Sequence, residues 1–334
     1  MKKNLTIMNV ARMAGVSKST VSRVLNNEST VKAKTREQVL RVIEESGYMP
    51  NEIARSLVRQ KSNLVGLITP FQVTSFYRNE YFRDVLRGIN SVLKKEAYDV
   101  ILSPGNGVEL DAIKKFVKTY HVCGIILLYS IPDDPSIQYL IDNEIPFVVI
   151  GESEGFSDIC QVSYDYRSAM FDIVNNFIRQ GCRKIAFFPS NTGISTVRSY
   201  IMGYIKALQA YDIPFESRYL VEHQDNLEDI KKTISCFKEN NTMPEAIIVH
   251  GDAVCLDLLS YCKAEGIRIP EDLAVFSLEN GPANEMLEIS SLDLNYIEMG
   301  SLASRLLLEM LEGEKASRHC LDYKIYYRNS SKFK

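Results

Sequence analysis

Residues 17–26 combine side chains that proteins use to read the edges of DNA bases. Ser17 is a good helix N-cap, and Val21, Val24 and Leu25 are spaced to pack inward on a helix that follows it. On the opposite face, basic side chains can donate to guanine O6 and N7, and hydroxyls can bind a base edge or a phosphate. The expected base contacts are Lys18 and Arg23, and Ser19 and Thr20 could contact either a base edge or a phosphate. The expected phosphate contacts are Thr6, Ser17, Ser22, Asn26 and Thr35.

Three short helices would position these side chains. Thr6 can cap the first helix, Gly15 permits the tight turn before the second, and Gly47 ends the third. The expected helices span residues 7–14, 18–26 and 33–46. This spacing predicts a helix-turn-helix domain over residues 1–49. A small helical bundle with a polar surface is the alternative that helix spacing alone leaves open.

The charge distribution favours a polyanionic partner for the N-terminal segment. Residues 1–61 contain 12 Lys and Arg against 5 Asp and Glu, whereas the whole chain has a net charge of −3. A basic segment on an acidic body can bind a polyanion such as DNA. A solvated basic face would show the same balance, so charge alone does not decide between them.

Several other classes of protein are disfavoured by what the sequence lacks. The 7 cysteines include no CxxC pair, the 4 histidines have no metal-ligand spacing, and no GxSxG or HExxH motif is present. No apolar run approaches the roughly 20 residues of a membrane helix, and none follows the charged N-terminus. We therefore expect a cytoplasmic protein that is not an enzyme and has no cofactor, no metal and no membrane partner.

Residues 50–62 have the features of a hinge. Pro50 suits the first turn of a helix, and residues 51–57 are enough for about two turns. A helix this short is not stable alone in water, so the segment should fold only against a partner. A plain linker is the alternative.

From residue 63 onward, apolar runs alternate with amphipathic stretches. The expected strands span residues 64–69, 98–102, 124–128, 146–150, 184–188, 246–250 and 273–276. The expected helices span residues 81–96, 110–120, 136–143, 166–180, 196–211, 227–239 and 252–265. Two consecutive series of this kind predict an α/β fold, a two-lobed and doubly wound domain over residues 63–334.

Ligands of such sheets bind beyond the carboxyl ends of the strands. Carboxylates and amides there can bind the hydroxyls of a polyol, and aromatic rings can cover its C–H surface. Tyr81 and Phe82 could instead pack inside a helix, and Asp252 could be a helix cap. The expected effector-binding residues are Phe71, Tyr81, Phe82, Tyr129, Gly151, Glu152, Arg198, Tyr200, Asp252, Glu279 and Asn280.

The N-terminal segment resembles the signature of the LacI/GalR repressor family. The resemblance runs through residues 6–26, 35–37, 47–51 and 54–57, and extends more loosely over the whole chain. It implies a sequence-specific transcriptional regulator. It also implies that the hinges of two subunits pair in the minor groove, where Leu57 wedges a base step. The other hinge residues implied at the DNA are Asn51, Ala54 and Arg55.

Residues 63–334 are most similar to the maltose-operon repressors of Gram-positive bacteria. The similar segments are residues 79–82, 85–89, 124–130, 137–140 and 145–151. The resemblance implies a fold like that of periplasmic sugar-binding proteins, with a maltose or maltodextrin effector between the lobes. It places the chain crossings near Gln161, Ser291 and Cys320, with one lobe over about 63–161 and 292–320 and the other over about 162–291 and 321–330.

Three positions depart from the family pattern. Tyr200 stands where a sugar-clamping arginine is expected, residues 162–166 differ from the usual Val-Asp-x-Asp-Asn, and Gly251 precedes Asp252 in place of a second polar residue. These changes predict an effector other than plain maltose, or weak binding of it.

The leading interpretation is a homodimeric repressor of a carbohydrate-utilisation operon, bound to double-stranded operator DNA and controlled by a sugar. One helix-turn-helix head reads only a few base pairs, so a pair of heads is needed for useful specificity. The alternatives are a regulator with a non-sugar effector or a protein corepressor and, less favoured, a solute receptor for transport.

Overall fold

The computed structural model describes residues 5–25, 28, 30–48, 62–69, 80–104, 109–190, 193–222 and 226–332. The chain divides into two compact units, Met1–Ser62 and Asn63–Lys334, and each is described here by itself. Six of the predicted site residues lie outside the described residues. They are Asn26, Asn51, Ala54, Arg55, Leu57 and Phe71.

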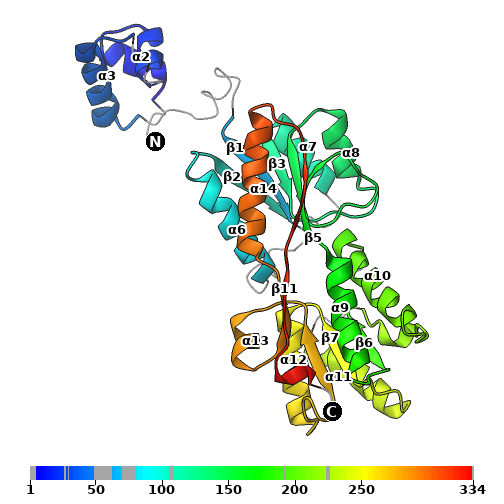
Figure 1. Cartoon of the computed structure of the whole chain (residues 1–334). Coiled ribbons are helices and arrows are strands. Elements are labelled where there is room, and N and C mark those ends of the chain that lie inside the picture. Colours follow the sequence, from blue (N-terminus) through cyan, green and yellow to red (C-terminus); the bar gives the residue numbers. More distant parts are fainter. Residues whose placement is uncertain are drawn as a thin grey trace. The chain divides into compact units, whose positions relative to one another are not determined.

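The first unit contains the three expected helices (Figure 1). They are α1 (Ile7–Met13), α2 (Lys18–Leu25) and α3 (Ala33–Ser46). Val10, Val21 and Val39 contribute one fully buried side chain from each helix to a common core. Gly47 ends α3 in the left-handed conformation that its missing Cβ permits, with a φ of 64°. The predicted helix-turn-helix fold is therefore confirmed.

The second unit contains two sheets, each covered by helices on both faces. The first sheet has the order β10-β5-β4-β3-β1-β2, and all of its pairings are parallel. Its strands are β1 (Leu64–Thr69), β2 (Asp99–Pro104), β3 (Gly124–Leu127), β4 (Phe147–Ile150), β5 (Cys160–Tyr164) and β10 (Arg318–Leu321). The helices packed with this sheet are α6 (Glu80–Leu93), α7 (Glu109–Lys118), α8 (Pro135–Asp142) and α14 (Tyr296–Leu311).

Alternation along the strands builds a core on each face of the first sheet. Val65 and Leu67 of β1 join the core that contains α6 and α14, whereas Ile68 joins the core that contains α7 and α8. Figure 1 shows α6 and α14 side by side against the sheet.

The second sheet has the order β11-β9-β8-β7-β6, in which only the β11–β9 pairing is antiparallel. Its strands are β6 (Ile185–Phe188), β7 (Ala246–Val249), β8 (Ala274–Ser277), β9 (Ser290–Asp293) and β11 (Lys324–Tyr326). Its helices are α9 (Tyr166–Arg179), α10 (Ser195–Gln209), α11 (Leu227–Glu239), α12 (Asp252–Ala264) and α13 (Pro282–Met286). No helix among the described segments has the length and apolar content needed to cross a membrane.

Three connections join the two lobes. The chain passes from the first sheet to the second after Tyr164, returns after Asp293, and passes again after Leu321. The expected crossing points Gln161, Ser291 and Cys320 lie inside strands β5, β9 and β10, so each crossing comes a few residues later than the resemblance implied.

The strands and helices of this unit that periodicity did not predict are β5, β9, β10, β11, α13 and α14, and β5, β9 and α14 were missed although they contain buried residues. The edge strands β10 and β11 have only exposed and half-exposed residues, and α13 has five residues. Strand pairing alone identifies β10 and β11, because a half-exposed edge strand carries little hydrophobic signal. The predicted α/β, two-lobed architecture is otherwise observed.

Candidate functional site

Helix α2 presents a polar face beside a buried one. Val21 and Val24 are buried, whereas Lys18, Ser19 and Arg23 are exposed. Thr20 and Ser22 are partly exposed, so each retains a solvent-facing surface. The face predicted to contact bases is therefore accessible in this unit.

Hydroxyl groups fix the start of α2. The backbone N–H of Thr20 donates to Ser17 Oγ at 3.1 Å, which confirms Ser17 as the cap. Ser17 Oγ also lies 2.7 Å from Ser19 Oγ and 2.8 Å from Thr20 Oγ1. These contacts hold three hydroxyls at the helix N-terminus, where the backbone amides favour an anion such as a phosphate.

At the start of α1, the side chain of Asn9 reaches back to Thr6 and accepts its hydrogen bonds. Both the backbone N–H and the hydroxyl of Thr6 donate to Asn9 Oδ1, at 2.9 Å and 2.6 Å. Thr6 is exposed, and Thr35 is partly exposed in the first turn of α3. A phosphate contact from Thr6 would use a hydroxyl that Asn9 already orients.

Arg23 has an acidic neighbour. Its Nε lies 3.9 Å from Glu28 Oε2, and both side chains are largely exposed. A solvent-exposed ion pair at this distance contributes little to the free energy of unfolding. It leaves the guanidinium able to exchange Glu28 for a nucleic-acid acceptor.

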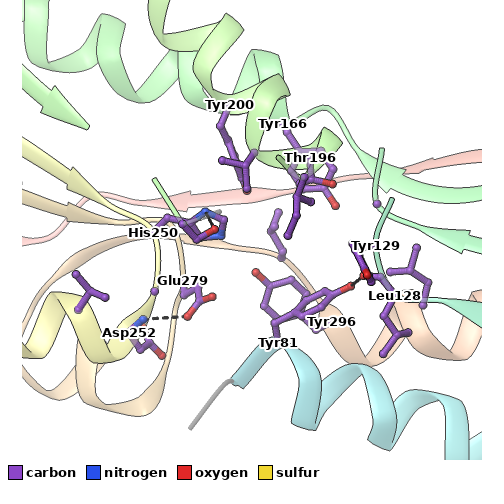
Figure 2. Close-up of a pocket in the computed structure, with 18 of the residues that line it drawn as sticks. Tyr81, Leu128, Tyr129, Tyr166, Thr196, Tyr200, His250, Asp252, Glu279 and Tyr296 are labelled. Carbon is purple, nitrogen blue, oxygen red and sulfur yellow. Dashed lines mark hydrogen bonds between the residues drawn. The ribbon is translucent and has the colours of Figure 1, made fainter. Parts of the chain in front are cut away.

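A pocket of about 320 Å³ lies between the two lobes of the second unit. Figure 2 shows side chains from both lobes facing this space. The lining residues are Tyr81, Leu128, Tyr129, Ile150, Gly151, Tyr166, Ser190, Ile194, Thr196, Val197, Tyr200, His250, Gly251, Asp252, Ala253, Val254, Glu279, Leu294 and Tyr296. Strand ends and helix starts supply most of them, as the parallel topology requires.

Two sets of aromatic rings form much of the pocket wall. The rings of Tyr81 and Tyr296 meet edge to face with centroids 5.0 Å apart. Tyr166 and Tyr200 meet at 5.2 Å, and Tyr200 meets His250 at 5.6 Å. Such rings offer flat apolar surfaces to a ligand. Tyr81 is further fixed by donating its hydroxyl to the Leu128 carbonyl at 2.6 Å.

Glu279 and Asp252 supply an acidic corner (Figure 2). The backbone N–H of Asp252 donates to Glu279 Oε2 at 3.0 Å. The buried Asn284 donates through Nδ2 to Asp252 Oδ1 at 2.6 Å and to the Glu279 carbonyl at 2.8 Å. Both carboxylates are therefore held in fixed orientations before any ligand arrives.

His250 is a neutral polar group in this pocket. Its Nδ1 lies 3.1 Å from Ser190 Oγ. Burial lowers the pKa of His250 from 6.5 to about 4, so the ring is uncharged at neutral pH. The structure therefore brings a hydroxyl and an imidazole together, a pair that sequence analysis did not name. Among the described residues no carboxylate is hydrogen-bonded to this imidazole, so the orienting third group of a nucleophilic triad is lacking there.

Hydrogen bonds cross between the lobes beside the pocket. The backbone N–H of Glu152 donates to Thr196 Oγ1 at 3.0 Å, and the N–H of Ser195 donates to the Ser130 carbonyl at 2.9 Å. Gly151 has a φ of +99°, and a Cβ there would lie 2.7 Å from Thr196 Oγ1. The first turn of α10 therefore packs closely on the ends of β3 and β4.

The structure brings together six of the described effector candidates and places the others elsewhere. Those lining the pocket are Tyr81, Tyr129, Gly151, Tyr200, Asp252 and Glu279. Phe82 instead lies fully buried in the core, because successive helix residues point in different directions. Arg198 pairs across the lobes with Glu154 at 3.3 Å.

Two further candidates also lie outside the lining. Asn280 accepts hydrogen bonds from Arg328 Nη2 at 2.9 Å and from Ser291 Oγ at 2.7 Å, so its side chain is turned toward the sheet. Glu152 contributes its backbone to the contact with Thr196.

Several lining residues were missing from the sequence-based set. His250 lies at the carboxyl end of β7, so the same rule could have selected it, whereas Tyr166 follows β5, a strand that the sequence did not predict. Tyr296 begins α14 after the unpredicted strand β9, and no local signal marked it. Among the described residues no cluster suited to holding a metal ion is present.

Comparison with known proteins identifies the class. Residues 6–51 match the bacterial regulatory proteins of the lacI family, and residues 174–331 match a periplasmic binding protein-like domain. The chain is 30% identical over 319 residues to the transcriptional regulator MalR of Streptococcus pneumoniae, covering 94% of this chain and 95% of MalR. It is also 30% identical over 338 residues to catabolite control protein A of Priestia megaterium, covering 98% and 100%.

The chain belongs to the LacI family and is a DNA-binding transcriptional regulator. A putative LacI regulator from Bacillus cereus subsp. cytotoxis has a solved structure that is 27% identical, with a TM-score of 0.76 and coverage of 81% of this chain and 98% of that one. The Lac repressor dimer bound to operator is 21% identical, with a TM-score of 0.84 and coverage of 98% and 99%, and shows the shared fold.

Proposed function

We propose that the protein is a homodimeric repressor of a carbohydrate-utilisation operon, and that a sugar-like effector in the interlobe pocket controls its binding to operator DNA. The observation that carries this proposal is the pocket itself, which has walls from both lobes and aromatic and carboxylate side chains facing inward. A ligand that bridges both walls binds one lobe arrangement better than another and so shifts the balance between them.

The relatives support the same assignment. One matched structure, 24% identical, is a complex of the regulator CelR with cellobiose, and the Lac repressor structure is a dimer on its operator. In this chain the hinge residues Asn51, Ala54, Arg55 and Leu57 would pair with those of a second subunit. The exposed face of α2, with Lys18, Ser19, Thr20, Ser22 and Arg23, would read each half-site.

As the effector, maltose is less favoured than a sugar with fewer hydroxyls. Tyr200, at the position of the expected arginine, is only 2% exposed and packs between Tyr166 and His250. The ring offers an apolar face where a guanidinium would have bound hydroxyls, so a ligand with fewer hydroxyls on that side fits better. A non-sugar effector or a protein corepressor is the second candidate.

The test is DNase I protection of the chain's own promoter region at physiological salt, with and without a panel of sugars. We expect a two-fold symmetric footprint that one class of sugar abolishes. A symmetric footprint that no sugar changes would retain the regulator and reject a sugar effector. An asymmetric footprint the size of one half-site would reject the homodimer.

A further inference from the structure

The described lining of the interlobe pocket is polar at one end and apolar at the other. Strand ends of the second sheet supply polar groups, since Ser190 follows β6, His250 follows β7 and Glu279 follows β8. Strand ends of the first sheet supply Leu128, which follows β3, and Ile150, the last residue of β4. Figure 2 shows His250 and Glu279 on the side of the space opposite Leu128. A ligand that fills this space must itself have a polar part and an apolar part.

Helix α10 extends the apolar end of the pocket. Ile194, Val197 and Tyr200 all line the space and are spaced three residues apart, so they share one face of the helix. Val197 is only 2% exposed, yet it belongs to none of the apolar clusters that form the cores of the described chain. Its methyl groups therefore line the pocket and do not fill a core.

This face of α10 adjoins the strand ends of the first sheet. Two interlobe hydrogen bonds, of 2.9 Å and 3.0 Å, join the first turn of α10 to the segments that follow β3 and β4. The helix face and the strand ends thus form one aliphatic wall. It consists of Leu128, Ile150, Ile194 and Val197.

Polar atoms beside the aliphatic wall already have protein partners. The Tyr81 hydroxyl donates to the Leu128 carbonyl at 2.6 Å, and the Tyr129 hydroxyl donates to Glu109. Thr196 Oγ1 accepts the Glu152 N–H described above. A sugar ring has hydroxyls around its edge, and each of them loses its water without gaining a partner against aliphatic side chains. An apolar ring has no such cost, so the wall suits an apolar ring better than a second sugar.

We propose that the effector of this regulator is an aryl glycoside, a single sugar unit bonded to a planar aromatic group. The sugar hydroxyls lie at the polar end, and the aromatic group lies against the aliphatic wall and the rings of Tyr166 and Tyr200, which meet edge to face at 5.2 Å. This inference rests on the proposed function and names the class of its ligand. The volume of about 320 Å³ is at the low end of the roughly 300–1,000 Å³ usual for small-molecule sites, which suits one sugar with a one-ring substituent.

Isothermal titration calorimetry with the full-length protein tests the requirement for an aromatic group. The probes are the phenyl and methyl glycosides of glucose and of galactose, each in both anomeric forms, with maltose and cellobiose for comparison. Each phenyl and methyl pair shares its sugar and its anomeric configuration and differs only in the aglycone. We expect one phenyl glycoside to bind at least about tenfold more tightly than its methyl counterpart, because the phenyl group buries more apolar surface.

A substitution in the aliphatic wall locates the contact. Val197→Thr keeps the branched shape of the side chain but puts a hydroxyl into the wall. It should weaken binding of the phenyl glycoside by about tenfold and change binding of the methyl glycoside by less than about twofold. Met202→Thr, on the exposed side of the same helix, is the matched control and should behave as the wild type.

Thermal melting of each variant verifies that the fold is retained. Val197→Ala, which shortens the same side chain, is the second variant if Val197→Thr melts early. It should weaken binding of the phenyl glycoside by about fivefold, because less apolar surface is buried against the ligand.

The outcomes separate the two proposals. Equal binding of the phenyl and methyl glycosides, or tighter binding of a disaccharide, with a changed promoter footprint, would overturn the aryl assignment and keep a sugar-controlled regulator. Phenyl selectivity that the Val197 variants leave intact would also overturn it, since the aromatic group would then bind elsewhere. Selective binding that leaves the footprint unchanged would reject the aryl glycoside as the effector. If none of the probes binds and the footprint is unchanged, both the aryl glycoside and the sugar effector are rejected.

Discussion

The rings of Tyr81 and Tyr296 lie edge to face with their centroids 5.0 Å apart, although they belong to helices from distant parts of the chain. Tyr81 is in the first turn of α6, and Tyr296 is the first residue of α14. The two helices pack closely because Gly88 and Gly300 lie at their contact. A Cβ on Gly88 would overlap the Ile297 carbonyl oxygen, and one on Gly300 would overlap that of Val85. The glycine contact therefore positions two walls of the pocket.

Gly88→Ala should lower the free energy of unfolding by about 1–3 kcal/mol, since the added methyl meets backbone that cannot move aside. Chemical denaturation of the full chain measures this change. The control is Asn90→Ala on the exposed side of α6, which should have little effect. If the two variants had the same free energy of unfolding, the close packing of α6 on α14 would contribute nothing to stability.

Arg23→Ala should weaken binding to the operator fragment by about 1–3 kcal/mol, because it would remove the proposed bidentate contact to a base. Binding to random DNA should change much less. Fluorescence anisotropy with both DNAs at one salt concentration measures the difference. Arg41→Ala, which removes an exposed charge from α3, serves as the control. If both DNAs lose affinity equally in Arg23→Ala, the residue contacts phosphate and not a base.

Arg198→Ala should change effector affinity by less than about fivefold. The Arg198–Glu154 pair is about half exposed on both sides, and such pairs contribute about 0–1 kcal/mol. Lys206→Ala on the same helix controls for the general loss of a positive charge. Calorimetric titration compares the variants, and loss of binding only in Arg198→Ala would place this arginine on the ligand.

The stability of the second unit should depend on pH through His250. Its pKa falls from 6.5 to about 4 on burial, so the unfolded chain takes up a proton before the folded one does. The contribution of neutral His250 to the free energy of unfolding is fully present above about pH 6.5 and is lost as the pH falls toward 4.

Melting temperatures at pH 7.5 and pH 5 check this expectation. His250→Gln should show a smaller drop between the two values than the wild type. His319→Gln, in the edge strand β10 outside the pocket lining, is the control. An identical drop in wild type and His250→Gln would mean that other groups cause the pH dependence.

The sequence by itself determined the helix-turn-helix unit almost completely. Ser17 was predicted as the cap of α2, Val21 and Val24 as its buried face, and Gly47 as the end of α3, and each is observed. These features depend on contacts between residues at most four apart, so local spacing is sufficient to define them. Most of the alternation of buried strands and helices in the second unit was predicted for the same reason, but β5, β9 and α14 were not predicted.

Only the tertiary structure decided which side chains meet in the pocket. Tyr81 lines it while the neighbouring Phe82 is buried in the core, a difference set by the rotation of α6 against the sheet. Tyr296 enters the pocket because α14 packs on α6, a contact that no local pattern records. Strand ends predict where a ligand can bind, but the packing of distant helices determines which residues contact it.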